Sequence, residues 1–194
     1  RLLAELDPSD DDLVVFVGDL VRKGPNSRGV LRRVRDAPNM LSVRGNNEEK
    51  LLRGDASLPE LGPVDREYVR SMPVALSWED HLVVHGGVDH RKPLGDHGVD
   101  DVQNMRALDP DDGYDGPFWF EERDEGPRVF FGHTVLESPV YREYAVGLDT
   151  GCVYGGELTA YDVADDEFVS VPLDRTGQDR SPSKIVSPKR TTTV

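Results

Sequence analysis

The stretch MLSVRGNNEEKLLRG, residues 40–54, holds the first clue to the architecture of this 194-residue chain. It begins with a short apolar run, passes through Gly45, Asn46 and Asn47, and continues with helix-forming residues up to Gly54. The apolar run predicts a buried strand, and the later part predicts a helix over residues 48–53 that the glycine ends. Adjacent amides suit a turn, because Asn tolerates unusual backbone angles. Whether they do more depends on the residues at the ends of the other strands.

Four further apolar runs resemble the one that opens this stretch. Each has four or five residues and is rich in Val, Leu and Phe, which suits buried strands. With the first, they cover residues 13–17, 40–43, 81–84, 128–131 and 145–148. Between the first two, helical spacing predicts a helix that Ser27 caps and Pro38 ends. Residues 2–6 look like the end of another helix, and residues 158–162 and 168–171 predict an antiparallel pair that turns near Asp165 and Asp166.

The length of the chain suits one domain with a sizeable core. We place this domain at residues 1–173 and expect residues 174–194, which lack periodicity, to form a disordered tail. Residues 109–127 are acidic and glycine-rich, and they predict an irregular loop with an aromatic knot at Phe118, Trp119 and Phe120. Trp119 could stack on a nucleobase or anchor this loop, and anchoring is the favoured interpretation.

The chain carries a formal net charge of -14, from 37 acidic and 23 basic residues. Because nucleic-acid phosphates bind basic faces, this charge argues against a nucleic-acid partner. No apolar run approaches the roughly 18 residues of a membrane span, so no membrane partner is expected. The bias toward arginine over lysine and Asp over Glu resembles the cytosolic proteins of haloarchaea, the alternative being an ordinary acidic surface. The single cysteine, Cys152, allows no internal disulfide and fits a reducing, cytoplasmic setting, where we interpret it as a small buried residue.

Polar side chains follow four of the apolar runs, each beside a glycine. They are Asp19, Asn46, His85 and His133. In sheet proteins, sites form beyond the carboxyl ends of the strands, and glycine there lets backbones and ligands approach closely. We therefore expect these four side chains to converge on one point. A mixture of oxygen and imidazole donors suits Mn, Fe, Zn or Co better than Ca, which prefers oxygen alone.

Five stretches of the sequence together resemble the motifs of one superfamily. They are GDLVRKGPNS (18–27), RGNNE (44–48), VVHGG (83–87), FFGHT (130–134) and GLDTGCVYGGELTAYDV (147–163). The first four are similar to the successive motifs of the calcineurin-like metallophosphoesterases, the superfamily of the PPP serine/threonine phosphatases. The fifth resembles the C-terminal segment of bacterial and archaeal members, which include symmetrical bis(5'-nucleosyl)-tetraphosphatases.

This resemblance implies an α/β fold, a β-sandwich flanked by helices in four layers. It implies a metal-dependent phosphoesterase that hydrolyses phosphate esters or anhydrides with metal-activated water, acting on a phosphorylated small molecule or nucleotide, or on a phosphoprotein. Two divalent ions are expected, with Mn favoured over Fe, Zn or Co. Asp19 resembles the carboxylate that bridges the two metals, while Asn46, His85 and His133 resemble the remaining ligands of the second metal.

Three basic residues are candidates for binding phosphate oxygens of the substrate: Lys23, Arg44 and Arg106. For each, the alternative is a surface charge that nearby acids balance, and this alternative is favoured for Arg106. The remaining histidines, which have no counterpart in the superfamily, are interpreted as structural or exposed; they are His81, His90 and His97.

The chain departs from the superfamily in three places. The opening Asp-x-His motif, which ligates the first metal, is absent, so only one of two metal sites is complete. We expect that the first strand and part of the first helix were lost by truncation, because residues 2–6 resemble the end of that helix. Asn47 stands where the superfamily has the histidine that protonates the leaving group, and Arg22-Lys23-Gly24 replaces Asp-Arg-Gly, whose aspartate orients that histidine.

The loss of the acid and of its orienting partner points to a change of substrate. An amide does not titrate near neutral pH and cannot protonate a departing alkoxide. A phosphate leaving group, with a second pKa of about 6, needs little protonation. We therefore hypothesise that phosphoanhydrides such as dinucleoside polyphosphates, or activated esters, are preferred over phosphoserine. The alternative function is a catalytically inactive phosphate- or nucleotide-binding module.

Overall fold

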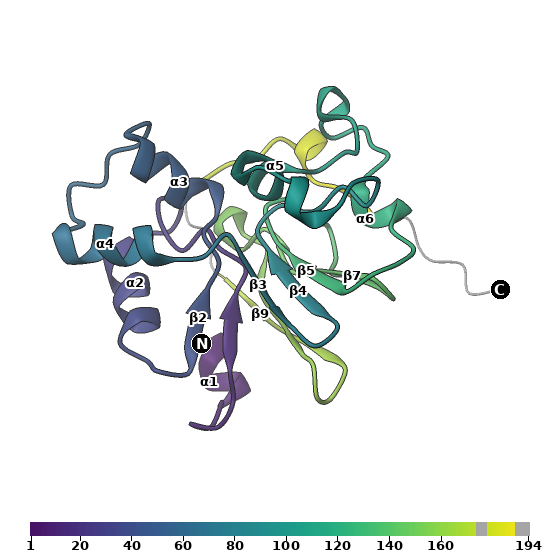
Figure 1. Ribbon diagram of the computed structural model, residues 1–194. Coiled ribbons are helices and arrows are strands. Elements are labelled where there is room, and N and C mark those ends of the chain that lie inside the picture. The colour runs from purple at the N-terminus through teal and green to yellow at the C-terminus, as the bar shows by residue number, and fades with distance from the viewer. Residues whose placement is uncertain (174–177, 189–194) are drawn as a thin grey trace.

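The computed structural model describes residues 1–173 and 178–188 of the chain. Helices and short strands alternate through its first half, and strands dominate the second half (Figure 1). The helices are α1 (Leu2–Leu6), α2 (Ser27–Arg35), α3 (Asn46–Arg53), α4 (Pro63–Ser71), α5 (Val99–Asn104) and α6 (Trp119–Glu122). The strands are β1 (Val14–Phe16), β2 (Met40–Ser42), β3 (Ala75–Trp78), β4 (His81–Val84), β5 (Arg128–Phe131), β6 (Val140–Arg142), β7 (Ala145–Gly147), β8 (Glu157–Asp162) and β9 (Glu167–Pro172).

The largest sheet of the described residues has the strand order β3-β4-β5-β7-β6. Its inner strands β4, β5 and β7 run parallel, while β3 and β6 pair antiparallel at the two edges. Two smaller sheets complete the strands: β1 pairs with β2 in parallel, and β8 pairs with β9 antiparallel. Parallel inner strands place their carboxyl ends at one edge of the sheet, where β4 and β5 deliver their following residues side by side.

Both faces of the largest sheet are buried, which explains why its strands are continuous apolar runs. Val83 and Phe130 face the core that the sheet shares with β1, β2, β8 and β9. Their neighbours in β4 and β5 alternate to the other face and pack against α5 and α6. The expectation of a β-sandwich flanked by helices is therefore confirmed.

A separate apolar cluster joins α2, α3 and α4, which lie together on one side of the molecule (Figure 1). Leu31, Leu51 and Val69 contribute one buried side chain from each of these helices. Val21 joins the same cluster, so it connects the chain just after β1 to the helices. Within the described residues, none of the helices combines the length and the apolar character needed to cross a bilayer.

The helix ends differ from the predicted ones by small shifts with clear causes. Asn26, not Ser27, caps α2, because its Oδ1 accepts the backbone N–H of Gly29 at 2.9 Å. The Ser27 hydroxyl instead accepts the backbone N–H of Arg22 at 2.9 Å. Helix α3 begins at Asn46, two residues earlier than predicted, and ends at Gly54 as expected. The predicted antiparallel pair is confirmed as β8 and β9.

For residues 178–188 the structure differs from the predicted disordered tail. The Gln178 side chain donates to the carbonyl of Lys23 at 2.6 Å, and Val186 is buried. The Val186 backbone donates to Val135 at 2.8 Å and accepts from Glu137 at 2.9 Å. These contacts join residues far apart in the sequence, so a periodic sequence pattern cannot predict them. Residues 174–177 and 189–194 lie outside the described residues, and for them the prediction stays a prediction.

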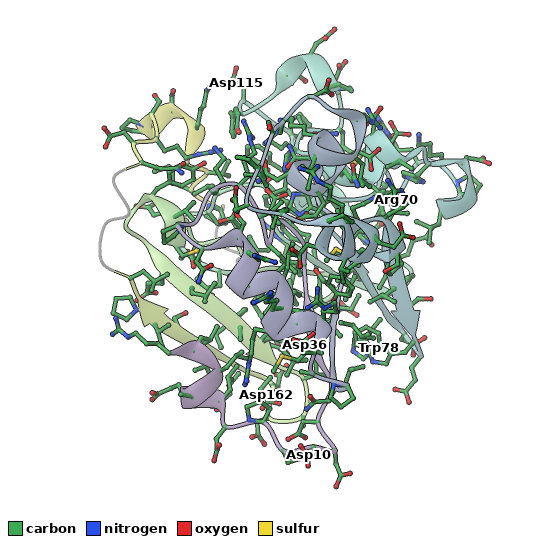
Figure 2. All side chains as sticks on the ribbon, turned by 90° about the vertical axis from the view of Figure 1, so that its left-hand side faces the viewer. Asp10, Asp36, Arg70, Trp78, Asp115 and Asp162 are labelled. Atoms are coloured by element: carbon green, nitrogen blue, oxygen red, sulfur yellow. The ribbon has the colours of Figure 1, made fainter. Side chains whose placement is uncertain are left out.

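The side chains of the surface are largely acidic, as the composition requires. Asp10, Asp36 and Asp115 are exposed and lie on different parts of the molecule (Figure 2).

Trp119 is fully buried, and its Nε1 donates to the carbonyl of Gly86 at 3.1 Å. The indole therefore anchors the loop of residues 109–127 and is not free to stack on a base.

The packing of Trp119 generates a stability prediction. A Cβ added at Gly87 would lie 2.1 Å from Nε1 of the buried indole, so Gly87→Ala must displace the ring. We expect the free energy of unfolding to fall by about 3 kcal/mol, which urea titration would measure. Gly95→Ala is the matched control, because a Cβ there has no atom within 4 Å. Its stability should stay within about 0.5 kcal/mol of the parent, and equal losses in the two variants would contradict this packing.

Candidate active site

The loop after β1 carries the first of the converging side chains, Asp19. Gly18 and Asp19 adopt left-handed backbone angles, with φ of 92° and 58°. At Gly18 a Cβ would lie 2.8 Å from both the Gly45 amide nitrogen and the His85 ring, so glycine is required for this close approach. The Asp19 Oδ1 accepts the backbone N–H of Asn47 at 2.9 Å, and Oδ2 accepts its side-chain Nδ2 at 2.7 Å.

Glu48, in the first turn of α3, holds this loop against the helix. Its carboxylate is fully buried and accepts the backbone N–H groups of Asp19 at 2.9 Å and Val21 at 3.0 Å. It also accepts the N–H of Gly45 at 2.9 Å, which caps its own helix. One carboxylate thus fixes the loop after β1 and the turn after β2 in a single arrangement, and sequence reasoning did not single it out.

His85 follows β4 and is almost completely buried. Its Nδ1 lies 2.7 Å from the carbonyl of Val17, which can only accept, so Nδ1 carries the proton. Its Nε2 lies 3.3 Å from Asp19 Oδ1 and 3.3 Å from Asn46 Oδ1. Burial alone would lower the pKa of His85, but the Asp19 carboxylate and the Val17 carbonyl raise it to about 9.

His133 completes the group from the end of β5. Its ring centroid lies 5.0 Å from that of His85, and its backbone has φ of 64°. The backbone N–H of Gly132 donates to the carbonyl of His85 at 2.9 Å, which keeps the two strand ends in register. The Nε2 of His133 is buried without a hydrogen-bond partner. Burial, followed by the charges of His85 and Arg106, holds the pKa of His133 well below its ordinary value, so the ring is neutral.

The donor set of these four residues fits a divalent transition-metal ion. With Nδ1 of His85 committed to a carbonyl, its Nε2 faces two oxygens, a contact that needs either a proton on Nε2 or a cation in its place. The unpartnered Nε2 of His133 adds a second imidazole donor. A carboxylate, an amide oxygen and two imidazoles suit Mn, Fe, Zn or Co.

The structure places Asp19 and Asn46 each 3.3 Å from Nε2 of His85, and His133 beside the His85 ring. In the described part of the chain, no three His, Cys, Asp or Glu side chains group closely enough to hold a metal by themselves. Arg44, a candidate for binding phosphate, forms an ion pair, with its Nε 2.9 Å from a carboxylate oxygen of Glu49.

Asn47 and Arg22 form a direct pair beside this group. An Arg22 Nη1 donates to Oδ1 of Asn47 at 2.8 Å, while Nδ2 of the same amide donates to Asp19. Both ends of the amide are therefore engaged, and its orientation is fixed. The resemblance to the superfamily identifies each residue as a replacement, and the structure shows that the two replacements contact each other.

Two further cations and an acid surround the four residues. Lys23 lies over the ring of Tyr154, 5.7 Å from its centroid, and Arg106 lies 4.8 Å from the centroid of Tyr114. Asp149, which sequence reasoning missed, is close enough for the charge of Asp19 to act on it. Burial raises the pKa of Asp149, and Asp19 adds to that rise. Its place in the stretch GLDTG, which belongs to the fifth motif, could have marked Asp149 as a site residue.

Comparisons with known proteins agree with this geometry. The sequence pattern of the calcineurin-like phosphoesterase family matches residues 1–171. A symmetrical bis(5'-nucleosyl)-tetraphosphatase from Ralstonia nicotianae is 28% identical, covering 75% of this chain and 78% of that protein. The asymmetrical enzyme PrpE from Bacillus velezensis is 29% identical, covering 84% and 79%. A crystal structure described as a "putative diadenosine tetraphosphatase" is 30% identical, has a TM-score of 0.79, and covers 89% of this chain and 86% of that one.

The three hydrogen bonds to Glu48 generate a second stability prediction. Glu48→Ala would leave three buried N–H groups without an acceptor, and we expect the free energy of unfolding to fall by about 3 kcal/mol. Glu49→Ala, one position along the same helix, removes ion pairs with Arg44 and Arg53 and should cost less than about 1 kcal/mol. Urea unfolding of both variants measures the difference. If Glu48→Ala lowers the free energy of unfolding no more than Glu49→Ala does, the buried carboxylate does not hold the two loops together.

Proposed function

As a member of the calcineurin-like phosphoesterase family, the chain is a phosphoric ester or anhydride hydrolase, and we propose that it cleaves the phosphoanhydride bonds of dinucleoside polyphosphates. The tetraphosphatases from Ralstonia and Bacillus support a nucleotide polyphosphate as the substrate. They differ in being symmetrical and asymmetrical enzymes, so the proposal covers the class of bond and not the position of cleavage.

Members of this family are generally dependent on two metal ions, and Mn²⁺ is our proposed ion. Asp19, Asn46, His85 and His133 would hold one of them. When bound, divalent ions neutralise phosphoryl charge and activate water. The chain's own residues arrange this centre: the Val17 carbonyl fixes the tautomer of His85, and Asn47 orients the carboxylate of Asp19 through two hydrogen bonds.

The observation that carries the choice of anhydrides is the pair of Asn47 and Arg22. The amide has no proton to give at neutral pH, and the guanidinium bound to it stays protonated. No group at this position can therefore protonate a departing alkoxide. A nucleotide phosphate leaves as a stable anion, so its departure does not depend on such an acid.

The proposal predicts a strong dependence on the leaving group. Diadenosine tetraphosphate should be hydrolysed with a kcat/KM at least about 100-fold higher than that of a phosphoserine peptide, because the peptide's alkoxide lacks an acid. The double variant Arg22→Asp with Asn47→His restores the acid and its orienting partner. Its activity on the peptide should rise relative to its activity on diadenosine tetraphosphate. A parent protein that prefers the peptide would end the proposal.

The proposed ligands predict how metal binding responds to substitution. Calorimetry with Mn²⁺ should detect an ion that Asp19→Asn and His133→Ala bind at least about 100-fold more weakly, since the first removes the charge of a ligand and the second removes a donor atom. Turnover of p-nitrophenyl phosphate should fall in parallel and disappear with a chelator. His90→Asn is the control, because His90 lines a different cavity. If the control and the ligand variants bind Mn²⁺ equally well, the proposed ligand set is wrong.

A further inference from the structure

A segment outside the family match reaches the residues around the candidate site. The match ends at residue 171, but residues 178–188 continue over the top of the molecule in both views (Figures 1 and 2). The segment is fastened at both ends. Near its start the Gln178 side chain donates to the carbonyl of Lys23, and near its end Val186 is buried between backbone hydrogen bonds to residues 135 and 137.

Arg180 lies between these two attachments and is held by two tyrosines. Its Nη1 donates to the hydroxyl of Tyr154 at 3.2 Å, and its Nη2 donates to that of Tyr114 at 2.8 Å. The guanidinium carbon lies 5.0 Å and 5.7 Å from the two ring centroids. Its Nε donates to the carbonyl of Lys184 at 2.9 Å. A guanidinium fixed this way loses little freedom when it binds a ligand.

The same two tyrosine rings carry two other cations, and we call Lys23, Arg106 and Arg180 together the cationic rim. Arg106 lies over Tyr114, and Lys23 lies over Tyr154, so three positive groups gather on two tyrosines. The buried carboxyl of Asp149 lies close enough to interact electrostatically with both Arg106 and Arg180, so one acid faces two of these three cations. The Nε of Arg106 is moreover buried without a hydrogen-bond partner.

Three cations gathered on two rings are unexpected in a chain with 37 acidic and 23 basic residues. Like charges gathered on shared rings repel one another, so the arrangement is stabilised best by a bound anion. The rim also adjoins the four converging residues. Lys23 follows Asp19 by four residues, and the Gln178 side chain attaches the segment of Arg180 to the Lys23 carbonyl at 2.6 Å.

We propose that Arg180 is a specificity-determining residue that, together with Lys23 and Arg106, binds the phosphates beyond the reacting one in a polyphosphate chain. The inference rests on the proposed function and deepens it. A monoester has a single phosphoryl group, which the four converging residues would engage, and offers the rim nothing further. A polyphosphate extends its negative charge past that point and meets three cations, so the segment 178–188 selects polyphosphates over monoesters.

The test compares Arg180→Ala with the parent on two substrates. For diadenosine tetraphosphate, KM should rise at least about tenfold with little change in kcat, because ground-state binding is lost. For p-nitrophenyl phosphate, kcat/KM should stay within about twofold. Lys184→Ala is the matched control, since it removes a positive charge from the same segment but keeps the carbonyl that Arg180 contacts. Arg180→Lys should recover only part of the affinity, because lysine lacks the fork that reaches both hydroxyls.

A binding experiment keeps this inference separate from the proposed function. Calorimetry with inorganic tripolyphosphate on metal-free protein should show at least a tenfold higher Kd for Arg180→Ala than for the parent or Lys184→Ala. The parent could bind tripolyphosphate more tightly than Arg180→Ala and still hydrolyse no phosphoanhydride. In that case the proposed function fails and the assignment of Arg180 stands. Equal Kd values in parent and Arg180→Ala, or an equal loss on both substrates, would overturn the assignment. Thermal unfolding of each variant confirms that it is folded, and Tyr114→Phe, which frees one side of the guanidinium, should give a smaller loss in the same direction.

Discussion

The buried carboxylate of Glu48 is the interaction on which the candidate site depends. It gathers three backbone N–H groups, from Asp19, Val21 and Gly45, that belong to two separate loops. Asp19 has a left-handed backbone angle that needs external support. Burial and the nearby Asp19 charge raise the pKa of Glu48 to about 7, and the three N–H groups stabilise its ionised form. Together with the two hydrogen bonds from Asn47, these bonds fix the position of Asp19 relative to α3.

Much of the site could be predicted from the sequence, because its residues have local signals. Asp19, Asn46, His85 and His133 each stand beside a glycine at the end of an apolar run, and parallel strands bring such ends together. Arg180 had no such signal. It lies in a segment without periodicity, and its hydroxyl partners Tyr114 and Tyr154 are distant in the sequence. Helix α4, the edge strands and the cap of α2 were missed or shifted for a related reason, since short elements depend on their neighbours more than on their own pattern.

The replacement of an acid and its orienting partner by Asn47 and Arg22 is chemically consistent with the rest of the site. Each substitution alone would leave a mismatched neighbour: an amide beside an aspartate, or a guanidinium beside a histidine. Together they form a hydrogen bond and keep the amide directed at Asp19. The same change adds positive charge beside a centre that receives phosphate. With the cations on the two tyrosines, Arg22 would give an acidic protein a local positive charge that attracts a polyanion despite the unfavourable net charge.

The ladder between β4 and β5 has a further consequence for how the chain reaches its native state. The backbone N–H of Gly132 donates to the carbonyl of His85, which extends that ladder one step past the strands. This step lies at the two residues His85 and His133 that carry the imidazoles. A slip of one residue in either strand would turn the histidine that follows it to the other side of the sheet. An apolar side chain would then take its place. Correct alignment of β4 and β5 would therefore also assemble the candidate site, and a misaligned chain would lack the two imidazoles there.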